Sequence, residues 1–196
     1  MQPEPYTRRE YVAAFVELAS RIAAALKDVA PNALPIQMYV AGGAALHFHT
    51  GERVSVDVDA VFSRRVALPD RLDVAYRDED GTARLLYFDR QYNDTLGLMH
   101  DDTHVDSLPL TLPGIDPRVL DVRILTPLDL AVSKLGRFSE QDRADIAALA
   151  RRRLIDAKSL ESRATEALGG YVGDTTRLRG SIVSAKRIIA ANQPKR

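Results

Sequence analysis

The sequence predicts an α/β protein, with strand-like segments in the middle of the chain and helices towards both ends. Apolar residues recur at helical spacing over residues 8–28, which predicts a helix. Between residues 36 and 125 the apolar residues instead form short runs separated by turn residues, the pattern of β-strands. Helical patterns return over residues 126–192. We therefore expect a mixed α/β fold with a helical C-terminal part.

Length and composition fit a globular protein and exclude several chemistries. The chain has 196 residues, enough for one core, and we expect a domain over residues 1–150 with a helical appendage over residues 151–196. It contains no cysteine, which excludes disulfides, thiolate catalysis and Cys-ligated zinc and fits a cytoplasmic protein. The N-terminus lacks the apolar core of a signal peptide, and no apolar run approaches the length of a membrane span.

The first third of the chain predicts a helix followed by a strand–helix–strand unit. Thr7 and Glu10 have the spacing of a capping box at the start of the first helix. The apolar run over residues 36–40 predicts a strand, and a second strand is expected over residues 56–62. A short helix over residues 44–49 is expected between them.

Further strands are expected up to residue 125. The pattern over residues 69–89 predicts a β-hairpin, with the acidic segment 78–81 as its solvated turn. The polar segment 89–94 either lines a cleft or forms a loop. Residues 95–112 are expected to contribute one or two strands, and residues 119–125 another.

Two helix starts carry clear capping signals. Thr126 can cap a helix in which Pro127 takes the first position and Asp129 the third. Ser139 and Asp142 repeat the arrangement for a second helix. These signals predict two helices in succession after the last strand.

The stretch around residues 42–59 concentrates residue types that bind phosphates and metal ions. Gly42 and Gly43 follow the first strand and precede the short helix, so the backbone can approach a ligand and the helix start that follows suits a phosphate. Asp57 and Asp59 alternate with apolar residues and should share one face of a strand. Two adjacent carboxylates repel each other unless a cation such as Mg²⁺ neutralises them. The alternative is an exposed edge strand whose aspartates only keep it soluble.

This pattern resembles the nucleotidyltransferase superfamily, whose signature is Gly-Gly or Gly-Ser followed, about a dozen residues later, by Asp-x-Asp. Here 13 residues separate Gly43 from Asp57. The fuller form Arg53-x-Ser55-x-Asp57-x-Asp59 is similar to the AbiEii/MenT-like toxins and to related small stand-alone bacterial nucleotidyltransferases. The resemblance implies a small mixed sheet flanked by helices. It also implies an NTP substrate held with Mg²⁺ or Mn²⁺ by Asp57 and Asp59.

The resemblance implies a third carboxylate on a strand beside the Asp-x-Asp strand. Asp106 is our first candidate for this metal ligand and catalytic residue, and Asp121 the second. The same branch carries a Leu-x-x-x-Lys-Leu … Arg-Asp-x-x-Asp pattern, which Lys134 and Asp145 match, with Asp142 as a weaker match. The resemblance gives the lysine a phosphate contact and makes the aspartate part of the active site.

For the other residues the resemblance implies nucleotide binding. Gly42, Gly43 and Ser55 would contact phosphates, and Arg53 or Lys134 would stabilise the leaving pyrophosphate. An NMP would be transferred to a hydroxyl on an RNA, such as the 3′ end of a tRNA, or on a protein.

The toxin branch also implies a cognate antitoxin as a partner. Two alternatives stay open: a catalytically inactive nucleotide- or partner-binding module with the same fold, and an interaction protein that acts mainly through its partner.

The C-terminal part is basic although the formal net charge of the chain is zero. Two helices are expected over residues 156–192, separated by the pair Gly169-Gly170. Basic residues gather here, namely Arg151, Arg152, Arg153, Arg177, Arg179, Lys186 and Arg187. They form either a solvated face or a local surface for the phosphates of a nucleic acid, since the whole molecule provides no net attraction.

Overall fold

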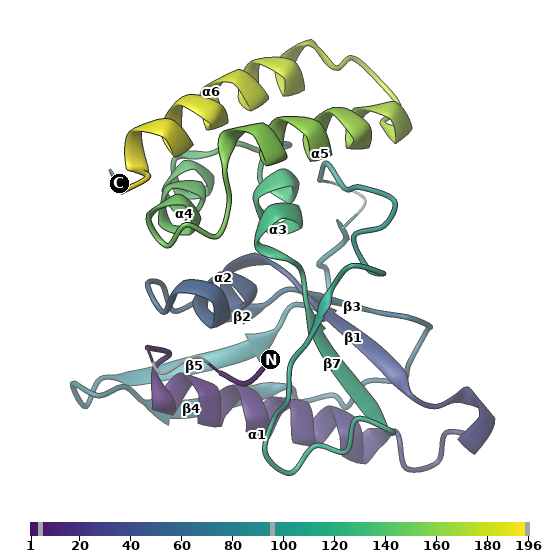
Figure 1. Ribbon diagram of the computed structural model, residues 1–196. Coiled ribbons are helices and arrows are strands. Elements are labelled where there is room, and N and C mark those ends of the chain that lie inside the picture. The colour runs from purple at the N-terminus through teal and green to yellow at the C-terminus, as the bar shows by residue number, and fades with distance from the viewer. Residues whose placement is uncertain (4–5, 95–96, 195–196) are drawn as a thin grey trace. The chain divides into compact units, whose positions relative to one another are not determined.

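The computed structural model describes residues 1–3, 6–94 and 97–194. Over these residues the protein is mixed α/β, with six α-helices, two small mixed sheets and a helical C-terminal part (Figure 1). The predicted fold class is therefore confirmed. None of the helices in the described part of the chain is long and apolar enough to cross a membrane.

The chain divides into two compact units. The first unit consists of Met1–Tyr92 and Ser107–Ile124 and holds both sheets. The second consists of Asn93–Asp106 and Leu125–Arg196 and holds the last four helices. The domain boundary expected at residue 150 stays a prediction.

The larger sheet of the first unit has the strand order β3-β1-β7-β6. Its central strands, β1 (Ile36–Val40) and β7 (Leu120–Ile124), are parallel. The edge strands β3 (Ala60–Phe62) and β6 (Leu108–Pro109) run antiparallel to their neighbours. β6 is the strand found within the predicted region 95–112, of which residues 95 and 96 lie outside the described residues.

The smaller sheet has the order β2-β5-β4 and contains the predicted hairpin. β4 (Asp73–Arg77) and β5 (Ala83–Phe88) pair antiparallel. β2 (Asp57–Val58) adds to β5 in parallel. The predicted strand over 56–62 is therefore split: the chain leaves the smaller sheet after Val58 and joins the larger one at Ala60. Asp59 lies at this crossing.

The turn of the hairpin is less solvated than its acidic sequence predicts. Gly81 N–H donates to the Asp78 carbonyl at 2.8 Å, as expected for a turn. The Asp78 carboxylate, however, is buried and accepts hydrogen bonds from Arg8 Nη1 at 2.6 Å and Arg84 Nε at 3.2 Å. The two arginines compensate the burial of this charge, so Asp78 connects the hairpin to the chain before the first helix.

Helix α1 (Arg9–Ala25) packs on the hairpin strands β4 and β5. The predicted capping box at Thr7 and Glu10 is wrong, because Arg8 is the N-cap and no side chain caps the helix. Thr7 therefore precedes the position from which a hydroxyl could bond the first turn. The buried face of α1 is apolar and aromatic: Tyr11, Ala14, Phe15, Leu18, Ala19 and Ile22.

Helix α2 (Gly42–Thr50) directly follows β1. It starts two residues earlier than the predicted segment 44–49, so that both glycines belong to its first turn. It ends at Gly51, which has a φ of +71° and thus the left-handed conformation common at helix ends. Strand β1 and the paired glycines therefore place a helix start next to the crossing at Asp59, whose carbonyl accepts from Ala41 N–H at 2.8 Å.

The second unit is a helical bundle. Its helices are α3 (Pro127–Ser133), α4 (Glu140–Arg151), α5 (Ala157–Gly170) and α6 (Thr176–Asn192), with α5 and α6 side by side (Figure 1).

Both capping predictions in this unit are confirmed. The Thr126 hydroxyl accepts from Asp129 N–H at 3.0 Å, and Ser139 and Asp142 form a complete capping box. Asp129 is itself buried and accepts from Arg163 Nε of α5 at 2.7 Å. This ion pair joins the start of α3 to α5.

Candidate active site

The two glycines that open α2 form a surface on which an aspartate packs closely. Gly42 has a φ of +56°, and a Cβ atom built there would lie 1.8 Å from Asp59 Oδ2. A side chain at position 42 would force Asp59 to move, and the left-handed φ disfavours residues other than glycine as well. Gly42 is therefore required for the carboxylate of Asp59 to lie against the first turn of α2.

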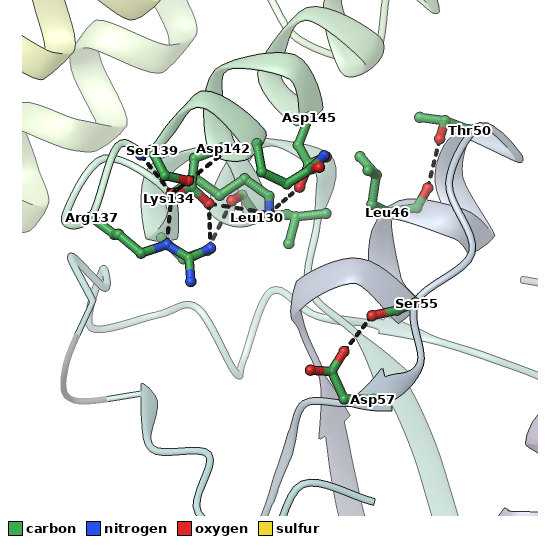
Figure 2. A network of polar contacts seen from close by, with 12 residues as sticks. Leu46, Thr50, Ser55, Asp57, Leu130, Lys134, Arg137, Ser139, Asp142 and Asp145 are labelled. Carbon is green, nitrogen blue, oxygen red and sulfur yellow. Dashed lines mark hydrogen bonds and ion pairs between the residues drawn. The ribbon is translucent and has the colours of Figure 1, made fainter. Parts of the chain in front are cut away.

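Gly43 likewise allows two further residues of the predicted motif, Ser55 and Arg53, to pack closely on α2. A Cβ atom at Gly43 would lie 2.6 Å from Ser55 Oγ and 2.9 Å from Arg53 Nη2. Ser55 is buried, and its hydroxyl donates a hydrogen bond to Asp57 Oδ1 (Figure 2).

The structure thus brings together all six residues of the motif in the first unit: Gly42, Gly43, Arg53, Ser55, Asp57 and Asp59. Their predicted roles in binding a nucleotide and a metal ion stay predictions. The arrangement places an arginine, a hydroxyl and two carboxylates around the N–H groups of a helix start. Such a combination of donors and carboxylates suits a phosphate bound together with a cation.

His47 stabilises the segment before the motif aspartates through two hydrogen bonds. It is fully buried on α2, its Nε2 accepts from Arg8 N–H at 3.0 Å, and its Nδ1 lies 2.9 Å from the Arg53 carbonyl. Burial lowers the pKa of His47 to about 4, so the ring is neutral and Nδ1–H donates to that carbonyl. His47 therefore holds the segment that carries Arg53. No motif in the sequence marks this role, because it depends on contacts across the fold.

Tyr11 of α1 is a second residue that sequence reasoning did not select. Its side chain is fully buried and its ring centroid lies 4.7 Å from that of His47. Burial raises the pKa of the Tyr11 hydroxyl, and the charges of Tyr76 and Asp57 act in the same direction. The hydroxyl is therefore protonated, and among the described residues it has no hydrogen-bond partner.

Neither Asp106 nor Asp121, the two candidates for a third carboxylate, lies on β5, the strand that pairs with β2. Asp106 belongs to the second unit, outside any strand, and accepts from Arg163 Nη2 at 2.6 Å. Asp121 lies on β7, which pairs with β1 and β6, and forms an ion pair of 3.2 Å with Arg123. The strand paired with β2 is β5.

Asp89 is the residue that follows β5, the strand paired with β2. Asp57 pairs with Tyr87 and Val58 with Phe88, and Asp89 N–H continues the ladder by donating to the Val58 carbonyl at 3.1 Å. The Asp89 carboxylate accepts from Gln91 N–H at 2.8 Å, so Asp89 ends the ladder beside the point at which the chain leaves β2. The pairing joins segments about 30 residues apart along the chain, which the sequence pattern does not indicate.

Lys134 and Asp145 also contact each other, within the second unit. Lys134 Nζ donates to Asp145 Oδ2 at 2.6 Å and lies 3.9 Å from Asp142 Oδ1, with all three side chains buried (Figure 2). Gln141 Nε2 donates to the second oxygen of Asp145 at 2.8 Å. The lysine is thus held by the aspartates of α4.

Asp142 has several other partners. Arg137 Nε and Nη2 each donate to its carboxylate at 2.9 Å, and Ser139 N–H donates at 2.9 Å. Burial alone would raise the pKa of Asp142, but the hydrogen bonds from Arg137 and Ser139 outweigh it and lower that pKa to about 2. Asp142 is therefore an ionised structural carboxylate at the start of α4.

The donor set of the first unit fits a divalent cation that is shared with a nucleotide. Among the residues that the structure describes, no group of three or more histidine, aspartate or glutamate side chains is arranged to hold a metal ion. Two carboxylates are nevertheless the usual protein contribution to Mg²⁺, whose other ligands are phosphate oxygens and water. Asp57 and Asp59, next to the cradle of Gly42 and Gly43, match that requirement.

Comparison with known proteins gives one match. Residues 18–179 match the model of a family described as nucleotidyltransferase of unknown function (DUF6036). No curated protein and no solved structure matches the chain. The matched range includes every residue of the motif in the first unit as well as Lys134 and Asp145.

Proposed function

Because the chain belongs to this family of nucleotidyltransferases, we propose that it transfers an NMP from an NTP to a hydroxyl acceptor with the help of Mg²⁺ or Mn²⁺. The observation that carries the proposal is the close packing of Asp59 on Gly42, and of Ser55 and Arg53 on Gly43. The packing explains why both positions carry glycine, and it places a carboxylate, a hydroxyl and a guanidinium beside the start of α2, a donor set that suits a phosphate bound together with a cation.

Each residue of the motif has a role that its chemistry supports. The N–H groups at the start of α2 bind phosphate oxygens of the NTP. The Arg53 guanidinium stabilises the charge that develops on the departing pyrophosphate. Ser55 orients Asp57 through its hydrogen bond, so that the carboxylates are fixed before the nucleotide binds.

Asp57 and Asp59 hold the divalent cation, which when bound neutralises charge on the phosphates and on the attacking oxygen. Asp89 is our candidate for the third carboxylate, supported by its backbone hydrogen bond to Val58, the residue between Asp57 and Asp59. From there it accepts the proton of the acceptor hydroxyl or positions that hydroxyl. By the resemblance to AbiEii/MenT-like toxins, Lys134 contacts a phosphate and Asp145 is an active-site carboxylate. The contact that the structure describes for these two residues is an ion pair within the second unit.

The resemblance to AbiEii/MenT-like toxins extends the proposal to acceptor and partner. It rests on Arg53-x-Ser55-x-Asp57-x-Asp59, which this chain carries in full. By this resemblance the acceptor is an RNA, such as the 3′ end of a tRNA, or a protein, and a cognate antitoxin controls the activity.

A second candidate function is a nucleotide- or partner-binding module with the same fold but without transfer. One observation favours it: no three acidic or histidine side chains among the described residues are arranged for one metal ion. A fold of this kind does not by itself establish activity.

A labelling experiment separates the two. Purified protein is incubated with each α-³²P-labelled NTP, Mg²⁺, total tRNA and a protein extract, in parallel with the double variant Asp57→Asn/Asp59→Asn. Label in RNA or protein with the wild type alone supports transfer and identifies the acceptor. If no label appears but NTP with Mg²⁺ raises the unfolding temperature of the wild type and not of the variant, the protein is a binding module.

A further inference from the structure

The second unit contains an arginine-lined groove that the nucleotidyltransferase site does not use. Its volume is about 660 Å³, and it lies between the start of α4 and one face of α6. The residues that line it include Arg137, Phe138, Arg143, Arg177, Ser184 and Arg187. All of them belong to the second unit.

The groove carries excess positive charge. Arg137 is paired with Asp142, but among the described residues Arg143, Arg177 and Arg187 have no carboxylate within ion-pair distance. Arg177 instead donates to the Arg137 carbonyl at 2.8 Å, and the Arg143 guanidinium lies over the Phe138 ring, 4.9 Å from its centroid. Several cations that converge on one hollow without anionic partners attract a polyanion.

Two neighbouring basic residues are instead paired with carboxylates. Lys186 Nζ, next in sequence to Arg187, donates to Glu161 Oε2 at 2.5 Å. Arg163 is held by Asp129 and Asp106. Arg177 and Arg187 in the groove thus differ from Lys186 and Arg163, whose charges are paired.

Two of the arginines that line the groove are spread along α6. Arg177 and Arg187 are ten residues apart on α6, which at 1.5 Å per residue is about 15 Å. This separation lets the two arginines contact different phosphates of one extended strand. The Phe138 ring is covered by Arg143 and is not open for base stacking, which leaves phosphate contacts as the main interaction.

We propose that this groove binds the phosphodiester backbone of a single nucleic-acid strand, without sequence preference, through Arg143, Arg177 and Arg187. The proposal goes beyond nucleotide transfer and does not require it, since none of these residues belongs to the motif of the first unit.

The test measures binding of fluorescent 20-nucleotide single strands of RNA and DNA to the full chain, by anisotropy over a series of NaCl concentrations. Each phosphate contact contributes about 0.7 to the magnitude of the slope of log K against log[salt]. The variant Arg177→Gln/Arg187→Gln should lower that magnitude by about 1.4. At 0.1 M salt this slope means that each contact raises the binding constant roughly fivefold, so the variant should bind about 25-fold more weakly.

The matched control is Lys186→Gln, which removes one positive charge from the same helix but from a residue paired with Glu161. It should bind nearly as the wild type does. The variant Asp57→Asn/Asp59→Asn should also keep its affinity for the strand, so that a failure of the proposed transfer is separable from a failure of this proposal. The ratio of the RNA and DNA affinities identifies the natural strand.

Three results would overturn the proposal. The first is absence of salt-dependent binding by the wild type. The second is an equal loss of affinity in Lys186→Gln and in the double arginine variant. The third is displacement of the strand by ATP at the same phosphate concentration, which would assign the groove to a mononucleotide.

Discussion

The buried ion pair between Lys134 and Asp145 predicts a large loss of stability when the lysine alone is replaced. Lys134 keeps 7% of its side-chain surface exposed and Asp145 only 2%, so the substitution Lys134→Met leaves a carboxylate in an environment that excludes water. Removing one partner of such a pair costs about 3–5 kcal/mol, because the remaining charge stays buried. With a urea m-value of about 2 kcal/mol/M, the unfolding midpoint should fall by about 2 M.

The assay is urea unfolding followed by far-UV circular dichroism, with two further variants. Lys186→Met is the matched control: its partner Glu161 is 51% exposed, and exposed pairs contribute at most about 1 kcal/mol. The double variant Lys134→Met/Asp145→Leu removes both charges and should recover most of the loss. If Lys134→Met unfolds at the same urea concentration as the wild type, the pair is not the structural contact described here.

Two further predictions concern the first unit. Since burial lowers the pKa of His47 from 6.5 to about 4, the unfolded state binds a proton that the folded state excludes between these pH values. The free energy of unfolding should therefore fall by about 3 kcal/mol as the pH drops from 6.5 to 4 and should not change through this group above pH 6.5. Subtracting the pH profile of His47→Gln isolates the contribution, and parallel profiles would contradict it. For the glycine cradle, Gly42→Ala should abolish Mg²⁺–NTP binding, measured by calorimetry, because its Cβ would displace Asp59. Gly81 also has a positive φ but no atom within 4 Å of an added Cβ, so Gly81→Ala should lose only about 1–2 kcal/mol of stability and keep its affinity for the nucleotide; equal loss of binding in both variants would refute the role of the cradle.

Local signals in the sequence predicted those parts of the fold that depend on neighbouring residues. The caps at Thr126 and Ser139 could be predicted because each requires only a hydroxyl and an N–H three residues later. The structure confirms both caps. The turn at residues 78–81 is also found where its sequence indicates. The capping box at Thr7 failed because the start of α1 is one residue away from the position that the pattern requires.

Contacts between distant segments could not be predicted in this way. The pairing of β2 with β5 places Asp89 directly after the strand next to β2, and no local pattern in the sequence indicates this pairing. The choice of Asp106 as the third carboxylate stays a prediction. His47 likewise acts through Arg8 and the Arg53 carbonyl, which lie on either side of it along the chain. Strand register and side-chain burial are consequences of the whole fold, and one sequence without its fold does not determine them.

The most direct test of the proposed function is the rate of NMP transfer by Asp59→Asn compared with Asp121→Asn. Both substitutions remove one carboxylate from the first unit, but Asp59 lies on the glycine cradle, whereas Asp121 lies on β7 and is paired with Arg123. Loss of a metal-binding carboxylate removes several kcal/mol of transition-state stabilisation, so transfer by Asp59→Asn should fall by at least about 100-fold. Asp121→Asn should stay within a few-fold of the wild type. Equal rates for Asp59→Asn and the wild type would contradict the assignment of this site.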